Sequence, residues 1–235
     1  MDREPIDLSH FYSGGYFLIR EGHPGWEQLK GPLLPDRLIS LSSCIATHFQ
    51  LHWGVNLGDK AKAKEFGIPQ SRWDAFVDWC NNAHRVEIAF TSTFYSPEAA
   101  RRFINQFVPD VTGLHLIGVG LAKEMEQQYW QEPLEPSQSL CGVDEQIEKH
   151  LLLEEGGHTL GFDMVGLVYC DFDHSWLCHY LHLEVYEALG IRPGIYGLIQ
   201  TEQEAQQVCE WVNANDPENA PYDYWLLVDY PLVNS

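Results

Sequence analysis

The spacing of apolar residues predicts three amphipathic helices. The clearest begins at Thr201, whose hydroxyl can cap the first turn while Glu204 reaches back, and runs to about Asn213. A second begins at Ser96 with a proline at its first helical position, and a third opens at Ser71. The stripes expected to be buried are Ala205, Val208, Cys209, Trp211 and Val212 in the first helix, Ala99, Phe103, Ile104 and Phe107 in the second, and Trp73, Phe76, Val77 and Cys80 in the third.

Five segments rich in β-branched and aromatic residues, each bounded by turn-forming residues, predict strands between these helices. The order of helices and strands is mixed, which favours an α+β fold: a mixed, largely antiparallel sheet layered with amphipathic helices, with room for one or two βαβ units. We interpret Gly118-Val119-Gly120 as a turn from strand to helix, and the sequence shows no internal repeat. The predicted strands cover residues 37–45, 85–94, 114–120, 161–170 and 222–230.

A proline-containing polar stretch at residues 133–139 is a candidate linker. It divides the chain into a near-neutral α/β half, residues 1–132, and a strongly acidic α+β half, residues 140–235. The sequence leaves open whether the two halves form separate units or share one core.

Charge is distributed unevenly along the 235 residues, which carry 34 acidic and 14 basic side chains and a net charge of −20. Residues 1–123 have a net charge of −1, whereas residues 124–235 have a net charge of −19 with only Lys149 and Arg192 as basic residues. Binding to phosphate backbones requires clustered Lys and Arg. This composition therefore argues against a sequence-independent nucleic-acid-binding protein.

The acidic, proline-containing N-terminal residues do not have the pattern of a secretory signal, and we expect none. The apolar runs have the length of strands and are too short to span a bilayer, so we expect no membrane association. The six cysteines fall at irregular intervals without a C-x-x-C pair, which favours unpaired thiols in a cytoplasmic protein.

The densest group of reactive side chains lies between Asp171 and His182. Carboxylates, imidazoles and thiols bind divalent metals such as zinc, so this group is a candidate metal site, and a metal-dependent hydrolase is one hypothesis for the function. We expect a helix over residues 175–189 with Leu177, Leu181, Val185, Ala188 and Leu189 buried. The alternative interpretation is a helix cap at Asp173 or Ser175 with Cys178 and His182 at the edge of the core. The candidate ligands in this group are Asp171, Asp173, His174, Cys178 and His182.

A second candidate pair is His48 and His52, which share one face in either a helix or a strand. The sequence between them lacks the glutamate of a zinc-protease helix. They are therefore either additional metal ligands or residues of a polar face.

The acidic half is either a solvated surface or a docking surface for a basic protein. In the second case carboxylates steer the association and aromatic side chains anchor it. Candidate contacts with the partner are Glu154, Glu155, Asp216, Glu218, Tyr222, Asp223, Tyr224 and Trp225.

Three classes of function follow from these observations. The favoured class is a non-enzymatic binding protein that docks a basic protein, in its most concrete form an immunity-type inhibitor of a cationic toxin, with no cofactor. The second is a metal-dependent hydrolase that uses the group between Asp171 and His182. The third is a structural or regulatory interaction domain, and the oligomeric state is left open in every case.

Overall fold

The computed structural model confirms the α+β class. It describes residues 6–22, 33–49, Lys64, 66–83, 87–89, 93–130, 142–168, 171–216 and 221–233, except for the side chains of Ala83, Leu167, Val168, Asp171 and Asp173. Within this part of the chain, no helix is long and apolar enough to cross a membrane.

Eight strands of the described residues form one antiparallel sheet in the order β3-β4-β1-β5-β8-β6-β7, with β2 paired to β1. The first half of the chain contributes β1 and β5 and the second half contributes β8 and β6, so one continuous sheet joins them. The strands are β1 (Phe11–Arg20), β2 (Thr47–His48), β3 (Ile88–Ala89), β4 (Thr93–Phe94), β5 (Leu114–Ala122), β6 (His158–Val168), β7 (Asp171–Ser175) and β8 (Asp223–Tyr230).

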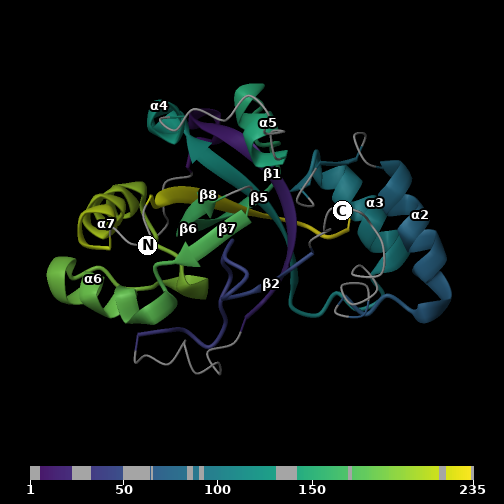
Figure 1. Cartoon of the computed structure of the whole chain (residues 1–235), viewed down its shortest axis with the longest axis horizontal. Coiled ribbons are helices and arrows are strands. Elements are labelled where there is room, and N and C mark those ends of the chain that lie inside the picture. The colour runs from purple at the N-terminus through teal and green to yellow at the C-terminus, as the bar shows by residue number, and fades with distance from the viewer. Residues whose placement is uncertain are drawn as a thin grey trace.

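Helices cover both faces of the sheet. On one face, buried residues of α2, α3, α6 and α7 pack with alternate residues of the central strands, and on the other face the buried side of α5 does so. Figure 1 shows α2 and α3 at one end of the molecule and α6 and α7 at the opposite end. The helices are α2 (Trp73–Ala83), α3 (Pro97–Phe107), α4 (Glu126–Tyr129), α5 (Gly142–Glu148), α6 (Leu181–Leu189) and α7 (Glu202–Asn215), and short 3-10 turns lie at Leu8–His10, Gln70–Arg72, Lys123–Met125, Cys178–Tyr180 and Ile195–Gly197.

The helix caps agree with the sequence. Ser96 accepts a hydrogen bond from the backbone N–H of Ala99 at 3.1 Å, and Thr201 accepts one from Glu204 at 3.2 Å. The third helix begins with a 3-10 turn at Gln70, and its Phe76 and Cys80 are buried. These three predicted helices are confirmed.

Two predicted strands differ in the structure. The predicted strand over residues 85–94 is divided into β3 and β4, which pair with each other. The predicted strand over residues 37–45 is wrong: apart from a bridge between Leu38 and Gly22, this segment consists of bends and turns. Serine hydroxyls explain the difference, because Ser40 Oγ accepts a hydrogen bond from the N–H of Ser42, and Ser42 Oγ accepts one from Cys44. Such local bonds compete with strand pairing.

Two glycine-rich segments are strands rather than turns. Gly14 and Gly15 lie inside β1, where Gly15 has a φ of 99° next to a break in the register with β5. Gly118 and Gly120 lie inside β5, so the predicted turn at this position is wrong. The absence of a side chain leaves room there for Leu153, whose Cδ2 would lie 3.0 Å from a Cβ on Gly118.

The segment that joins α5 to β6 crosses this face of the sheet. The N–H of Glu154 donates to the Tyr16 hydroxyl at 2.8 Å, and the Tyr230 hydroxyl donates to the Glu154 carbonyl at 2.5 Å. The buried side chain of Leu153 lies over the β5 glycines. Two tyrosines from the two halves of the chain therefore hold this crossing segment.

Candidate functional site

The group between Asp171 and His182 is not a continuous helix. β7 ends at Ser175, a 3-10 turn follows, and α6 begins only at Leu181. His179 and Tyr180 have positive φ values of 51° and 65°, which a helix cannot contain. The predicted start of the helix at Ser175 is therefore wrong, and Cys178 does not precede His182 by one helical turn.

His182 is buried at the start of α6, and a hydrogen bond with the backbone of Leu177 does not offset the effect of burial on its pKa. Burial lowers the pKa of His182 and so favours the neutral imidazole. The rings of His174 and His179 pack edge to face, with their centroids 5.9 Å apart. Cys178, the residue before His179, is buried.

Within the described part of the chain, no three His, Cys, Asp or Glu side chains are arranged to hold a metal ion. The side chains of Asp171 and Asp173 are outside that part, as is His52. His48 Nε2 lies 2.8 Å from the carbonyl oxygen of Ser40 and is engaged there. The metal site thus stays a prediction, because it depends on side chains outside the described residues.

Four predicted partner contacts must be corrected. Tyr222, directly before β8, and Asp223, Tyr224 and Trp225 at the start of β8 are all buried. Apolar side chains cover β8 on each face. They contribute to the core and offer no surface to a partner.

The other predicted contacts are three acidic residues that the structure describes and one that it does not. Glu154 and Glu155 are exposed on the crossing segment. Asp216 follows α7 and accepts a hydrogen bond from the Tyr222 hydroxyl at 2.9 Å. Glu218 lies outside the described residues. A docking role for these acidic residues therefore stays a prediction.

A different surface, on α6, combines exposed acidic and aromatic side chains. Leu181 and Val185 of α6 are buried, whereas Tyr180, directly before the helix, and Glu184, Tyr186 and Glu187 on it are exposed. We call these four residues together with Leu189 the α6 surface. The exposed fractions are 45% for Tyr180, 44% for Tyr186 and 37% for Leu189.

Sequence reasoning missed this surface because it assigned Leu189 and Ala188 to the buried stripe, whereas both are exposed. The segment after α6 also exposes an apolar side chain, because Ile195 is 61% exposed. The available signal was the pair Tyr186 and Leu189, three positions apart on a helix next to acidic residues.

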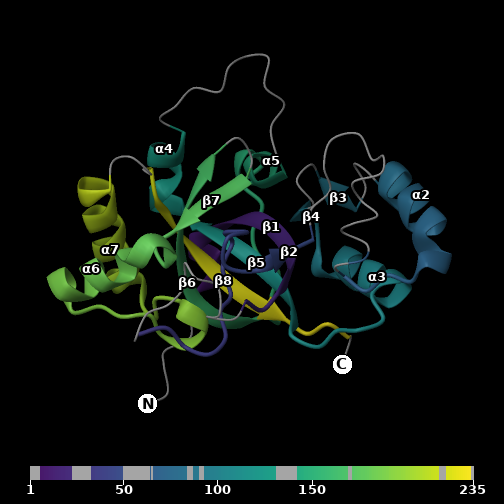
Figure 2. The ribbon, with the colours of Figure 1, turned by 60° about the horizontal axis from the view of Figure 1, so that its bottom comes forward.

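Residues with strained backbone lie on either side of the α6 helix. His179 and Tyr180 precede α6, and Tyr196 lies beyond it with a φ of 57°. Bulky residues rarely adopt this conformation, and strained positions tend to occur at functional sites. The α6 helix lies at the α7 end of the molecule, away from α2 and α3 (Figures 1 and 2).

A second cluster, on the α5 face of the sheet, joins β5, β8 and the residue that follows β1 through charged groups. His115 Nδ1 lies 3.1 Å from Asp229 Oδ2, and His115 Nε2 lies 3.0 Å from Glu21 Oε1. Burial disfavours the charged ring, but the hydrogen bonds with Asp229 and Glu21 outweigh this effect and raise the pKa of His115. With a carboxylate at each nitrogen, the ring is a structural link between strands rather than an available base.

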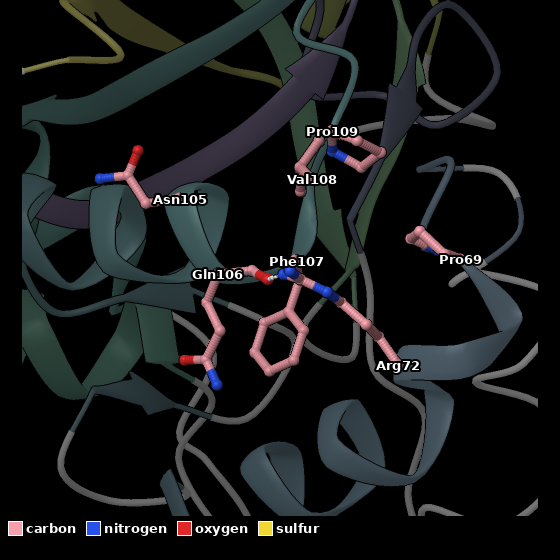
Figure 3. Close-up of a pocket in the computed structure, with 7 residues that line it drawn as sticks. All are labelled: Pro69, Arg72, Asn105, Gln106, Phe107, Val108 and Pro109. Atoms are coloured by element: carbon pink, nitrogen blue, oxygen red, sulfur yellow. Dashed lines mark hydrogen bonds between the residues drawn. The ribbon is translucent and has the colours of Figure 1, made fainter.

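A surface pocket of about 250 Å³ lies at the C-terminal end of α3 (Figure 3). The Arg72 guanidinium reaches across it and donates to the carbonyl of Gln106. No carboxylate, thiol or imidazole is among the residues that line it, so it offers no acid, base or nucleophile for catalysis. The lining residues are Pro69, Arg72, Asn105, Gln106, Phe107, Val108 and Pro109.

The chain matches none of the family models, curated proteins or solved structures with which it was compared. Its own geometry is therefore the basis for a functional proposal.

Proposed function

We propose that this protein is a non-enzymatic binding protein that docks a basic protein partner on the α6 surface. The observation that carries the proposal is the combination of exposed Tyr180, Tyr186 and Leu189 with exposed Glu184 and Glu187 along α6 and the residue before it. Aromatic side chains supply binding energy at interfaces, and surrounding carboxylates steer a cationic partner toward them.

The charge of the segment that contains α6 supports a cationic partner. Residues 171–216 contain eight acidic side chains and one basic side chain, Arg192. A surface of this kind attracts basic proteins at low ionic strength and repels acidic ones. The most concrete form of the proposal is an immunity-type inhibitor that covers a cationic toxin such as a nuclease.

The test is to identify the basic protein that copurifies from the native cells at low salt, including the product of the neighbouring reading frame. That protein is then purified and titrated by calorimetry into the wild type and into Glu184→Lys/Glu187→Lys. We expect the double variant to weaken binding at least about tenfold, equivalent to about 1.4 kcal/mol. Tyr186→Ala should remove a hot spot of about 2 kcal/mol.

A matched control is Asp74→Lys/Asp78→Lys, which makes the same charge change on the exposed side of α2 at the other end of the molecule. It should leave the affinity nearly unchanged. Equal losses in both double variants would show a general charge effect without a docking site. Full affinity in the α6 variants would rule out this surface.

A further inference from the structure

The strands of the two halves repeat about an approximate two-fold axis at the central pair Val119 and Leu227. In the first half, β1 pairs with the central strand β5, and β4 lies beyond β1. In the second half, β6 pairs with the central strand β8, and β7 lies beyond β6. Each outer strand has a break in register at a glycine with positive φ. Gly15 is opposite Val119, and Gly161 is opposite Leu227.

This symmetry makes Phe17 and Asp163 equivalent. Each lies two residues after its glycine, Phe17 opposite Ile117 and Asp163 opposite Trp225. Phe17 packs in the apolar layer beneath α5, and its ring lies 5.8 Å from that of Phe172. The fold thus accepts an apolar side chain at this position in one half and has a carboxyl in the other.

The Asp163 carboxyl is fully buried. Its Oδ2 accepts hydrogen bonds from the Ser40 hydroxyl at 2.8 Å and from the N–H of Leu41 at 2.6 Å. Burial raises the pKa of Asp163 to about 6, although hydrogen bonds from the backbone of Leu41, the Ser40 hydroxyl and the backbone of Met164 act in the opposite direction.

Asp163 holds residues 38–46, the latch segment, against β6. The same segment is bound at other points: Leu38 exchanges two backbone bonds with Gly22, and the N–H of Ile39 donates to the carbonyl of Tyr196 at 3.0 Å. Tyr196 adjoins the exposed Ile195, so the latch segment is connected to the loop that continues from the α6 surface.

Other titratable groups surround this arrangement. His48 on β2 lies against the Ser40 carbonyl, and Asp223 on β8 is opposite Val165, the next residue of β6 on the same face. At the other end of the segment, Arg37 pairs with Glu21 at 3.5 Å, beside His115 and Asp229. Tyr196 packs edge to face on His115, with centroids 5.6 Å apart.

We propose that Asp163 is a pH-sensitive latch: loss of its proton to solvent at neutral pH favours release of residues 38–46 and loosens the loop that carries Ile195, whereas protonation closes the segment on β6. The carboxylate gains hydration when the segment opens, which drives the release. The latch itself depends only on Asp163 and its contacts, and its effect on docking rests on the proposed function.

The size of the effect follows from linkage. An exposed aspartate titrates near 4 and the buried one near 6, so the opening equilibrium changes by about 100-fold in total, of which about tenfold falls between pH 5 and pH 8. Hydrogen exchange of the latch segment measures this change directly. The rates must first be corrected for the intrinsic effect of pH on amide exchange.

We expect protection of the latch segment to fall about tenfold between pH 5 and pH 8 in the wild type, and to stay constant in Asp163→Asn. The matched control is Asp223→Asn, which removes another buried carboxyl with a pKa of about 6 but leaves the latch contacts in place. Its latch segment should still respond to pH. If Asp163→Asn does not fold, Ser40→Ala removes one donor to the carboxylate and should move the transition to higher pH.

Amides of β5 distinguish local release from global unfolding. Constant protection of the latch segment in the wild type would overturn the proposal, as would a loss that occurs equally in β5. The same response in Asp163→Asn as in the wild type would also overturn it. Because these measurements use the protein alone, a failure of docking on the α6 surface would leave their outcome unaffected.

Discussion

Gly118 lies in the middle of β5, where three side chains converge on the sheet. A Cβ at this position would lie 2.7 Å from the Tyr230 ring, 3.0 Å from Leu153 and 3.1 Å from the Tyr16 ring. The two tyrosines also hold the crossing segment through Glu154, so neither can move without disturbing that segment. We expect Gly118→Ala to lower the free energy of unfolding by about 1–3 kcal/mol, measured by urea denaturation.

The comparison variant is Gly14→Ala in β1, where the nearest atom to a new Cβ is Val143 Cγ1 at 3.3 Å. The smaller overlap should give a smaller loss. Equal effects of the two substitutions would mean that strand glycines are replaceable irrespective of their neighbours.

Some contacts of single residues could not be predicted from the sequence. Asp163 bonds to Ser40 and Leu41, 123 and 122 positions away, and His115 contacts Asp229, 114 positions away. No local pattern signals such partners. The buried polar contacts were therefore accessible only once the sheet order was known.

At the scale of elements, the cap of α7 is a local feature that the sequence predicts and a mutation can test. Thr201 Oγ1 accepts from the N–H of Glu204 and donates to the Glu204 carboxylate at 3.0 Å. Thr201→Ala should destabilise the protein by about 1 kcal/mol, seen as a lower midpoint of thermal unfolding. Thr201→Ser keeps the hydroxyl and should restore most of this loss, and an alanine variant as stable as the wild type would exclude a role for the cap.

Elements with a local signal were predicted well, and elements whose form depends on distant contacts were not. The helices at Ser96 and Thr201 have caps, and β5, β6 and β8 have dense apolar runs. β1 was missed because its paired glycines are typical of turns, although Gly15 forms an irregularity within a strand. The candidate site shows the same limit. The spacing of Leu189 fits an apolar stripe along α6, but the hydrophobic core does not reach the C-terminal end of α6, and Leu189 is exposed.

At the scale of the whole molecule, two buried carboxyls and one partly buried histidine favour acidic conditions. Burial raises the pKa of Asp163 and that of Asp223 to about 6, and the carboxylates around His115 raise its pKa. The native state therefore binds more protons than the unfolded chain, and stability falls as pH rises through these pKa values. His182 acts in the opposite direction because its pKa is lowered.

We expect the free energy of unfolding to be about 2 kcal/mol higher at pH 5 than at pH 8, measured by urea denaturation at constant ionic strength. Repulsion among the charges that make up the net −20 acts in the same direction. Asp163→Asn/Asp223→Asn should reduce the difference. Greater stability at pH 8 would show that these carboxyls are hydrated in the native state.

Because β5 pairs with β8, each half of the chain covers the central strand edge of the other half. Separated from its counterpart, either half would present the backbone donors and acceptors of a long apolar strand, and such an edge recruits further strands. Because the axis at Val119 and Leu227 relates the two strands, the most compatible substitute for a missing half is a second copy of the half that remains. Covalent continuity between the halves thus protects the protein from self-association at its own centre.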